Sequence, residues 1–253
     1  MNRLFISILL THAAAMSFTG CVNASNRQLS DYSAENRASD TSFVLNVFEP
    51  SGLALLTSGD ALYVVSDKNG SVYRIDFTGN VLERLPFKGK DLEGIDVDKT
   101  TGEIWIVEES KQNIHHLSKD GNEIDKITAV HLDTKKGSGF EGIAKNGDTL
   151  YILIEKDPGL LIKYCLSSKT WKDYPLSFAK DYSGIDYDTS DNSLWIVSDE
   201  SKSLNHCDLN GRVISTQKIK VLQAEGVVVD RKGKCVWIVS DKAHTLYRIR
   251  LKI

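Results

Sequence analysis

Acidic residues recur at two fixed positions of a repeated pattern in this 253-residue chain. One set precedes a glycine and an apolar run, and it consists of Glu93, Glu141 and Glu225. The other set closes a short apolar run, and it consists of Asp67, Glu109, Glu155, Asp199 and Asp241. Carboxylates without cysteine or histidine suit a hard cation, and Ca²⁺ takes about 6–8 oxygen ligands. Crowded like charges repel unless a cation lies between them, so both sets are candidate calcium ligands.

A structural role is the alternative for these acids, because they could cap turns by accepting hydrogen bonds from backbone N–H groups. We favour turn capping for the acids that close the apolar runs. For the three glutamates we favour the ion, since Ser51 and Ser183 replace glutamate at this position in two other repeats. A purely structural requirement would apply equally to those serines.

The elements that must position these acids are short strands in five repeats. The repeats begin at Ser51, Glu93, Glu141, Ser183 and Glu225, at intervals of 42 to 48 residues. In each repeat a first apolar strand follows the glycine, and an aromatic residue then opens a second apolar run. A third run follows, and a weaker fourth strand completes every repeat except the last. Four short strands rich in β-branched and aromatic residues are typical of one β-propeller blade.

We therefore predict an all-β fold, a five-bladed β-propeller over residues 41–253. The last repeat contains only three strands, so residues 42–48 are predicted to supply the outer strand of the last blade and close the ring. In such a ring the first strands line a central channel, and the second strands run antiparallel to them. The starts of the first strands and the ends of the second strands then share one face, which brings up to eight carboxylates around one channel mouth.

Cysteine and histidine give little sign of further chemistry. Cys165 and Cys207 occupy the third-strand position and are expected to be small core residues rather than a disulfide pair, while Cys235 is expected to be unpaired. Four histidines are expected at the surface rather than as ligands: His115, His131, His206 and His244. The sequence contains no HExxH, GxSxG, P-loop or CxxC pattern, so standard hydrolytic and nucleotide-binding signatures are absent.

The first residues predict export. Residues 1–20 read as a lipoprotein-type signal peptide, with Arg3 ahead of an apolar stretch too short to span a bilayer. The Gly20–Cys21 pair resembles a lipobox, which predicts lipidation of Cys21; ordinary secretion with cleavage near Cys21 is the alternative. Residues 21–40 are polar and predict a flexible tether. We expect a protein anchored to a cell membrane, facing the periplasm from the outer membrane if two membranes are present.

The charge of the chain bears on the class of partner that it can bind. The formal net charge is −3 and no basic stripe is visible, which argues against nucleic acid as a partner. We expect a monomer whose partner, an unidentified ligand or protein, binds at the channel face.

The DLEGIDVD segment (91–98), the GFEGIA segment (139–144), the WIVSD strands and the lipoprotein-like start together resemble the bacterial SdiA-regulated family. Members are exported five-bladed propellers with distant similarity to NHL-repeat proteins. The resemblance implies a calcium site, with Glu93, Glu141 and Glu225 as the first ligands and the second-strand acids as lesser candidates. Ser51 and Ser183 depart from the glutamate pattern, so the site is expected to be asymmetric.

The leading hypothesis is a non-enzymatic, calcium-stabilised binding platform at the cell envelope. The alternative is a calcium-dependent hydrolase acting on lactones, esters or phosphoesters, by analogy of fold with paraoxonases and propeller phytases. A hydrolase needs a base within hydrogen-bond reach of the reacting group. No histidine falls at a predicted channel position, which favours binding over catalysis.

Overall fold

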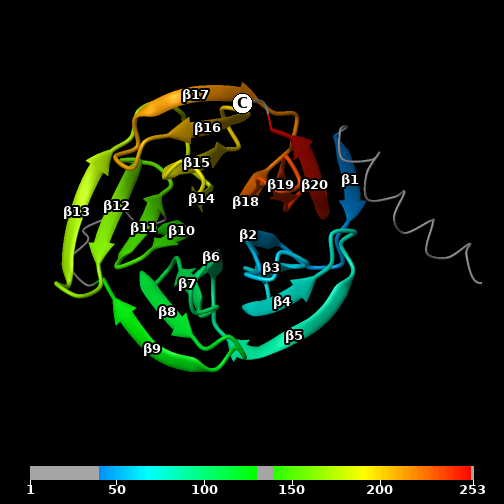
Figure 1. Cartoon of the computed structure of the whole chain (residues 1–253), viewed down its shortest axis with the longest axis horizontal. Coiled ribbons are helices and arrows are strands. Elements are labelled where there is room, and N and C mark those ends of the chain that lie inside the picture. Colours follow the sequence, from blue (N-terminus) through cyan, green and yellow to red (C-terminus); the bar gives the residue numbers. More distant parts are fainter. Residues whose placement is uncertain (1–39, 130–138, 252–253) are drawn as a thin grey trace, which may run out of the picture. The chain divides into compact units, whose positions relative to one another are not determined.

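The computed structural model describes residues 40–129 and 139–251. Its strands form five four-stranded antiparallel sheets arranged around a central axis (Figure 1). The predicted all-β, five-bladed propeller is confirmed. The predicted signal peptide, Cys21, the tether up to residue 39, and His131 lie outside the described residues. Among the described residues, no helix is long and apolar enough to cross a membrane.

Each blade runs from an inner strand at the axis to an outer strand at the rim. Blade 1 contains β2 (Pro50–Leu55), β3 (Leu62–Ser66), β4 (Ser71–Ile75) and β5 (Val81–Lys88). Blade 2 contains β6 (Leu92–Val97), β7 (Ile104–Glu108), β8 (Asn113–Leu117) and β9 (Glu123–Thr128). Blade 3 contains β10 (Phe140–Asn146), β11 (Thr149–Ile154), β12 (Leu160–Cys165) and β13 (Thr170–Pro175). Blade 4 contains β14 (Gly184–Asp188), β15 (Ser193–Ser198), β16 (Ser203–Cys207) and β17 (Val213–Lys218). Blade 5 contains β18 (Ala224–Asp230), β19 (Cys235–Ser240), β20 (Thr245–Arg250) and, as its outer strand, β1 (Thr41–Val44).

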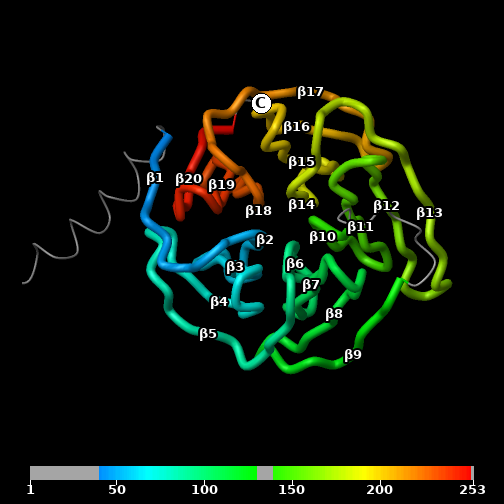
Figure 2. Tube along the Cα trace, turned by 180° about the vertical axis from the view of Figure 1, so that it is seen from behind, coloured from blue at the N-terminus to red at the C-terminus, as the bar shows by residue number. Residues whose placement is uncertain are grey.

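The two ends of the propeller chain meet in blade 5, as predicted. β1 pairs antiparallel with β20, and the view from behind shows the two strands side by side (Figure 2). The strand is shorter than the predicted span of residues 42–48, because Val44 pairs with Thr245, where β20 begins, and no partner strand continues beyond it. Leu45 still donates its N–H to His244 at 2.8 Å and is buried. Asp40, the last residue of the predicted tether, accepts the N–H of Arg250 at 2.8 Å.

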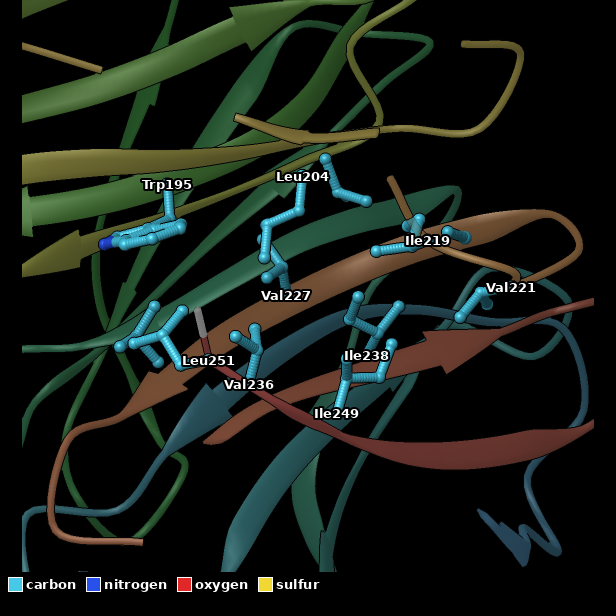
Figure 3. Packing of buried hydrophobic residues seen from close by; sticks show 12 residues of the cluster. Trp195, Leu204, Ile219, Val221, Val227, Val236, Ile238, Ile249 and Leu251 are labelled. Atoms are coloured by element: carbon cyan, nitrogen blue, oxygen red, sulfur yellow. The ribbon is translucent and has the colours of Figure 1, made fainter. Parts of the chain in front are cut away.

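The apolar core lies between neighbouring blades. In the cluster between blades 4 and 5, Trp195 and Leu204 face Val227, Val236 and Ile238 (Figure 3). Residues from one sheet pack into the face of the next, so each blade depends on both of its neighbours for burial of apolar area. The strands that carry the acids are thereby held in fixed positions around the axis.

The cysteines agree with the prediction at two of three positions. Cys207 and Cys235 are buried and unpaired. Cys165 is only half-buried, and its Sγ lies 3.0 Å from a carboxylate oxygen of Asp148. The reason is register: Cys207 pairs with Leu194, whereas the corresponding partner in blade 3, Leu150, pairs with Tyr164. Cys165 is one residue further on, and a shift of one residue turns a side chain to the other face of a sheet.

Candidate metal centre

The five repeated glycines close the centre of the propeller. A Cβ on Gly52 would lie 2.7 Å from the carbonyl oxygen of Glu93, and a Cβ on Gly184 would overlap the carbonyl oxygen of Glu225. Only glycine permits such a close approach of backbones. The space left at the axis is a cavity of about 10 Å³. The predicted channel is therefore closed at this level, and the acids that precede the glycines gather at its mouth.

The glutamates sit at irregular points of their strands. In β6, Leu92 pairs with Glu108 and Gly94 pairs with Val107, so Glu93 is an extra residue without a partner. Glu141 in β10 has the same arrangement, and the register of β18 also shifts between Ala224 and Val227, on either side of Glu225. A β-bulge leaves its extra residue unpaired and redirects its side chain. The bulges thus release these glutamates from the alternation that would otherwise fix their direction.

The acids of the second set directly follow the second strands. The N–H groups of Asp67, Glu109 and Asp241 each donate to a backbone carbonyl oxygen of the same blade. Each acceptor lies two residues before the residue that begins the repeat. For Glu109 the acceptor is Asp91, at 2.9 Å. These bonds hold the end of the second strand beside the start of the first. The structure places all eight predicted acids in half-buried positions: Asp67, Glu93, Glu109, Glu141, Glu155, Asp199, Glu225 and Asp241.

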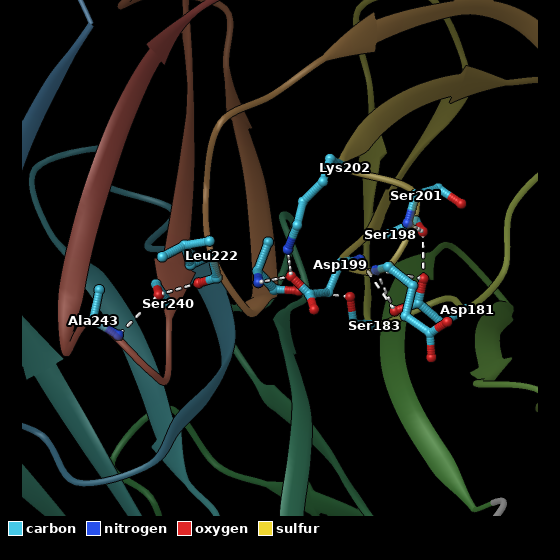
Figure 4. Close-up of polar contacts among 11 residues, drawn as sticks. Asp181, Ser183, Ser198, Asp199, Ser201, Lys202, Leu222, Ser240 and Ala243 are labelled. Atoms are coloured by element: carbon cyan, nitrogen blue, oxygen red, sulfur yellow. Dashed lines mark hydrogen bonds and ion pairs between the residues drawn. The ribbon is translucent and has the colours of Figure 1, made fainter.

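Turn capping after the second strands is largely carried out by the serines that precede the acids. Ser66 Oγ donates to the carbonyl oxygen of Phe48 at 2.5 Å and accepts the N–H of Asn69. Ser240 bonds Leu222 and Ala243 in the same way, and Ser198 accepts the N–H of Ser201 (Figure 4). Among the acids, Asp199 accepts the N–H of Ala224 at 3.2 Å.

Two predicted acids come together with a third that the sequence did not single out. One carboxylate oxygen each from Asp67, Asp91 and Glu93 lies within 4.8 Å of the other two. Oxygens that each lie about 2.4 Å from a calcium ion are at most about 4.8 Å apart, so the separation of these three oxygens is compatible with one shared ion. They come from two neighbouring blades. The sequence signal for Asp91 is its position two residues before Glu93, which Glu49 shares relative to Ser51 and Asp181 shares relative to Ser183.

Burial and mutual repulsion disfavour charge on these groups. Burial, then the negative charge of Asp91, raises the pKa of Asp67 to about 6. Burial, then Asp67, raises the pKa of Glu93 to about 9, although a hydrogen bond with the Ser51 hydroxyl lowers it. Burial and neighbouring acids raise the pKa of Glu225 to about 7 and that of Glu141 well above its usual range. Groups so arranged gain from a cation that would compensate their charge.

The mouth is electrostatically asymmetric. Lys156 Nζ lies 2.7 Å from Glu155, and Lys202 Nζ lies 2.5 Å from Asp199. Within residues 40–129 and 139–251, no lysine or arginine forms an ion pair with Asp67, Asp91 or Glu93. Glu109, Glu141, Glu225 and Asp241 also lack such a pair within those residues, so Glu155 of blade 3 and Asp199 beside blade 4 are the predicted acids that a lysine compensates there.

The histidines do not all follow the prediction of a surface location. His115 is only 6% exposed, and its ring contacts Glu108 at 3.0 Å and Glu123 at 2.6 Å. Glu108 occupies the position of the turn-capping serines and is itself buried, so it needs a buried partner. His206 is half-buried and stacks on Trp195. His244 is exposed, as expected.

Comparisons with known proteins agree with the fold. The sequence model of the SdiA-regulated family matches residues 26–250, so the chain belongs to this family. A streptogramin B lyase structure has a TM-score of 0.50 and 16% identity, over 84% of this chain and 73% of that one. The Myceliophteria thermophila Cps50 (Swd1) β-propeller domain has a TM-score of 0.50 and 14% identity, over 78% of this chain and 63% of that one. These two similarities show a shared propeller fold.

Proposed function

We propose that this member of the SdiA-regulated family binds Ca²⁺ at the mouth of the propeller and serves as a binding platform there. The observation that carries the proposal is the approach of Asp67, Asp91 and Glu93 to within 4.8 Å of one another. Three carboxylate donors without cysteine or histidine suit a hard cation. Calcium would supply positive charge that compensates these carboxylates.

The position of the cluster gives the ion a structural consequence. Asp67 directly follows the second strand of blade 1, Asp91 precedes the first strand of blade 2, and Glu93 is the second residue of that strand. An ion shared by these residues would join two blades that otherwise meet through apolar packing, backbone contacts and the hydrogen bond between Ser51 and Glu93. Because only the folded ring brings the three carboxylates together, binding should stabilise the folded state.

The rim of the mouth supports a platform role. Phe48 and Leu222 are 70% and 55% exposed, although both are apolar. Their carbonyl oxygens accept the Ser66 and Ser240 hydroxyl groups, so both residues lie beside second-strand ends. Exposed apolar side chains next to an acidic surface favour a partner that carries apolar and cationic groups.

We further propose that the platform is non-enzymatic and that a lipid on Cys21 attaches it to the cell envelope. Lipidation is tested by labelling the expressed protein with a fatty-acid analogue, with Cys21→Ser as the control that should lose both label and membrane association.

The hydrolase alternative is tested with lactone, aryl-ester and phytate substrates in calcium and in chelator. Calcium-dependent turnover that Glu141→Gln abolishes would contradict the binding-only function.

Calcium titration by calorimetry tests the proposed ion directly. The purified protein, first treated with chelator, should bind calcium saturably, and Asp91→Asn and Glu93→Gln should each weaken binding. Asp120→Asn is the matched control, since Asp120 is an exposed acid in the turn between β8 and β9. Equal affinities in all four proteins would place any bound calcium elsewhere.

A further inference from the structure

A group of positively charged side chains lies on the outer strands of blade 3, in contrast to the acidic mouth of the propeller. Lys163 of β12 and Lys172 of β13 are directly opposite each other in the register. Their Nζ atoms lie 4.8 Å and 5.0 Å from the centre of the Tyr174 ring. Like charges directly opposite each other on neighbouring strands are destabilising. Two lysines in this arrangement around one aromatic ring therefore favour an anion beside them.

The lysines adjoin a cleft between blades 3 and 4, whose outer strands β13 and β17 are neighbours at the rim (Figure 1). The cleft has a volume of about 680 Å³, within the range of small-molecule sites. Its lining includes Lys172, Tyr174, Phe178, Asn210, Arg212 and Val213. Arg212 comes from the turn before β17, where Asp208 accepts the N–H groups of Asn210 and Arg212. Cations from two blades thus reach one cleft.

These cations lack acidic partners among the described residues. Lys163 Nζ donates to the side-chain oxygen of Asn210 at 2.8 Å, and neither it nor Lys172 or Arg212 forms an ion pair within that part of the chain. A hydrogen bond with Lys172, together with the charge of both lysines, lowers the pKa of Tyr174. The whole chain carries a net charge of −3, so this concentration of positive charge is local.

We propose that this cleft binds a ligand that carries a phosphate group attached to an apolar group. Lys172 and Arg212 would contact the phosphate, for which the planar Arg212 guanidinium offers paired N–H donors. The apolar group would lie against Leu176, Phe178 and Val213, which line the same cleft. A soluble phosphate ester and a phospholipid headgroup share this chemistry. The site is separate from the acidic mouth and does not depend on calcium.

Calorimetric titration with hexyl phosphate, hexanol and inorganic phosphate tests the assignment on the purified protein. Hexyl phosphate should bind, hexanol should not, and inorganic phosphate should bind more weakly than hexyl phosphate. The double variant Lys172→Gln, Arg212→Gln should lose about tenfold or more in affinity for hexyl phosphate. Lys232→Gln, which removes an exposed lysine from the turn before β19, should bind like the wild type.

Vesicles distinguish the two sources of the phosphate. Co-sedimentation with phosphatidylcholine vesicles that contain phosphatidic acid, lost in the double variant, would identify a lipid headgroup. Hexyl phosphate binding without co-sedimentation would identify a soluble ester. The proposal is overturned if neither probe binds, or if the double variant binds both as the wild type does. Far-ultraviolet circular dichroism of each variant checks that the propeller is intact.

Discussion

The carboxylate of Asp67, at the end of β3, lies within 4.8 Å of the carboxylate of Glu93, the bulge residue of β6 in the next blade. Their proximity depends on two backbone features, the bulge at Glu93 and the bond from the Asp67 N–H to the Glu49 carbonyl oxygen at 3.0 Å. Two half-buried like charges at this distance repel each other. A cation between the two carboxylates would offset this repulsion.

Calcium affinity should rise with pH. The pKa of Glu93 is raised from its usual value to about 9, and that of Asp67 to about 6, so the metal-free folded protein holds these protons more tightly than the unfolded chain. Without calcium, the contribution of Glu93 to stability is greatest below about pH 4.5 and declines as the pH rises toward about 9. Calcium must displace the protons, which predicts up to a tenfold gain in affinity per pH unit for each proton displaced. Calorimetry at about pH 6 and about pH 8 checks this; a pH-independent affinity would contradict it.

Loss of an acid should lower calcium affinity by different amounts on the two sides of the mouth. Asp67→Asn should weaken calcium binding by about tenfold or more, because Asp67 has no cationic partner among the described residues. Asp199→Asn should have a smaller effect, since Lys202 already compensates the charge of Asp199 at 2.5 Å. Titration of both variants under the same conditions measures the difference. Equal losses would instead indicate an ion held by the whole ring.

The closed centre predicts that the repeated glycines cannot be enlarged without loss of stability. Gly184→Ala should lower the free energy of unfolding by about 1–3 kcal/mol, because the added Cβ would overlap the backbone of Glu225. Gly142→Ala is the matched comparison. Its Cβ would meet the Ile185 side chain at 3.0 Å and the Ile185 backbone nitrogen at 3.2 Å, which is a milder clash than the one at Gly184. Urea denaturation gives both values, and an unchanged midpoint for Gly184→Ala would show that the centre is open.

Closure of the ring by the N-terminal segment predicts a contrast between adjacent residues. Leu45 is 2% exposed and packs in the cluster shared by blades 1 and 5, whereas Val44 is 74% exposed. Leu45→Ala should cost about 2–5 kcal/mol of stability. Val44→Ala should change stability by less than about 0.5 kcal/mol. If thermal unfolding shows no difference between the two variants, the segment does not contribute to the core.

Much of the fold was predictable because a propeller repeats one unit. The recurring glycine, aromatic residue and apolar runs indicate the same four strands five times, and the incomplete last repeat indicates where residues 42–48 must go. Errors arose where one residue of register matters. Cys165 was assigned to the buried position that Tyr164 occupies. His115 pairs with Ile106 at a position that is also buried in blade 4, where Asn205 pairs with Ile196.

The candidate site was predictable only in part. The eight acids could be placed at one mouth because strand direction fixes which ends share a face. Asp91 was missed although Glu49 and Asp181 place acids at the same position in two other repeats, because it belongs to neither of the two aligned sets of acids. The bulges that redirect Glu93 and Glu141, and the glycine contacts that close the channel, depend on packing between blades that a single repeat does not reveal.

Thermal unfolding of the chelator-treated protein, with and without added calcium, tests the proposed calcium site. The midpoint should rise saturably with calcium, because the ion binds a site that exists only in the folded ring. The rise should be lost in Asp91→Asn and Glu93→Gln and kept in Asp120→Asn. A midpoint that calcium does not change would contradict a calcium site between blades 1 and 2.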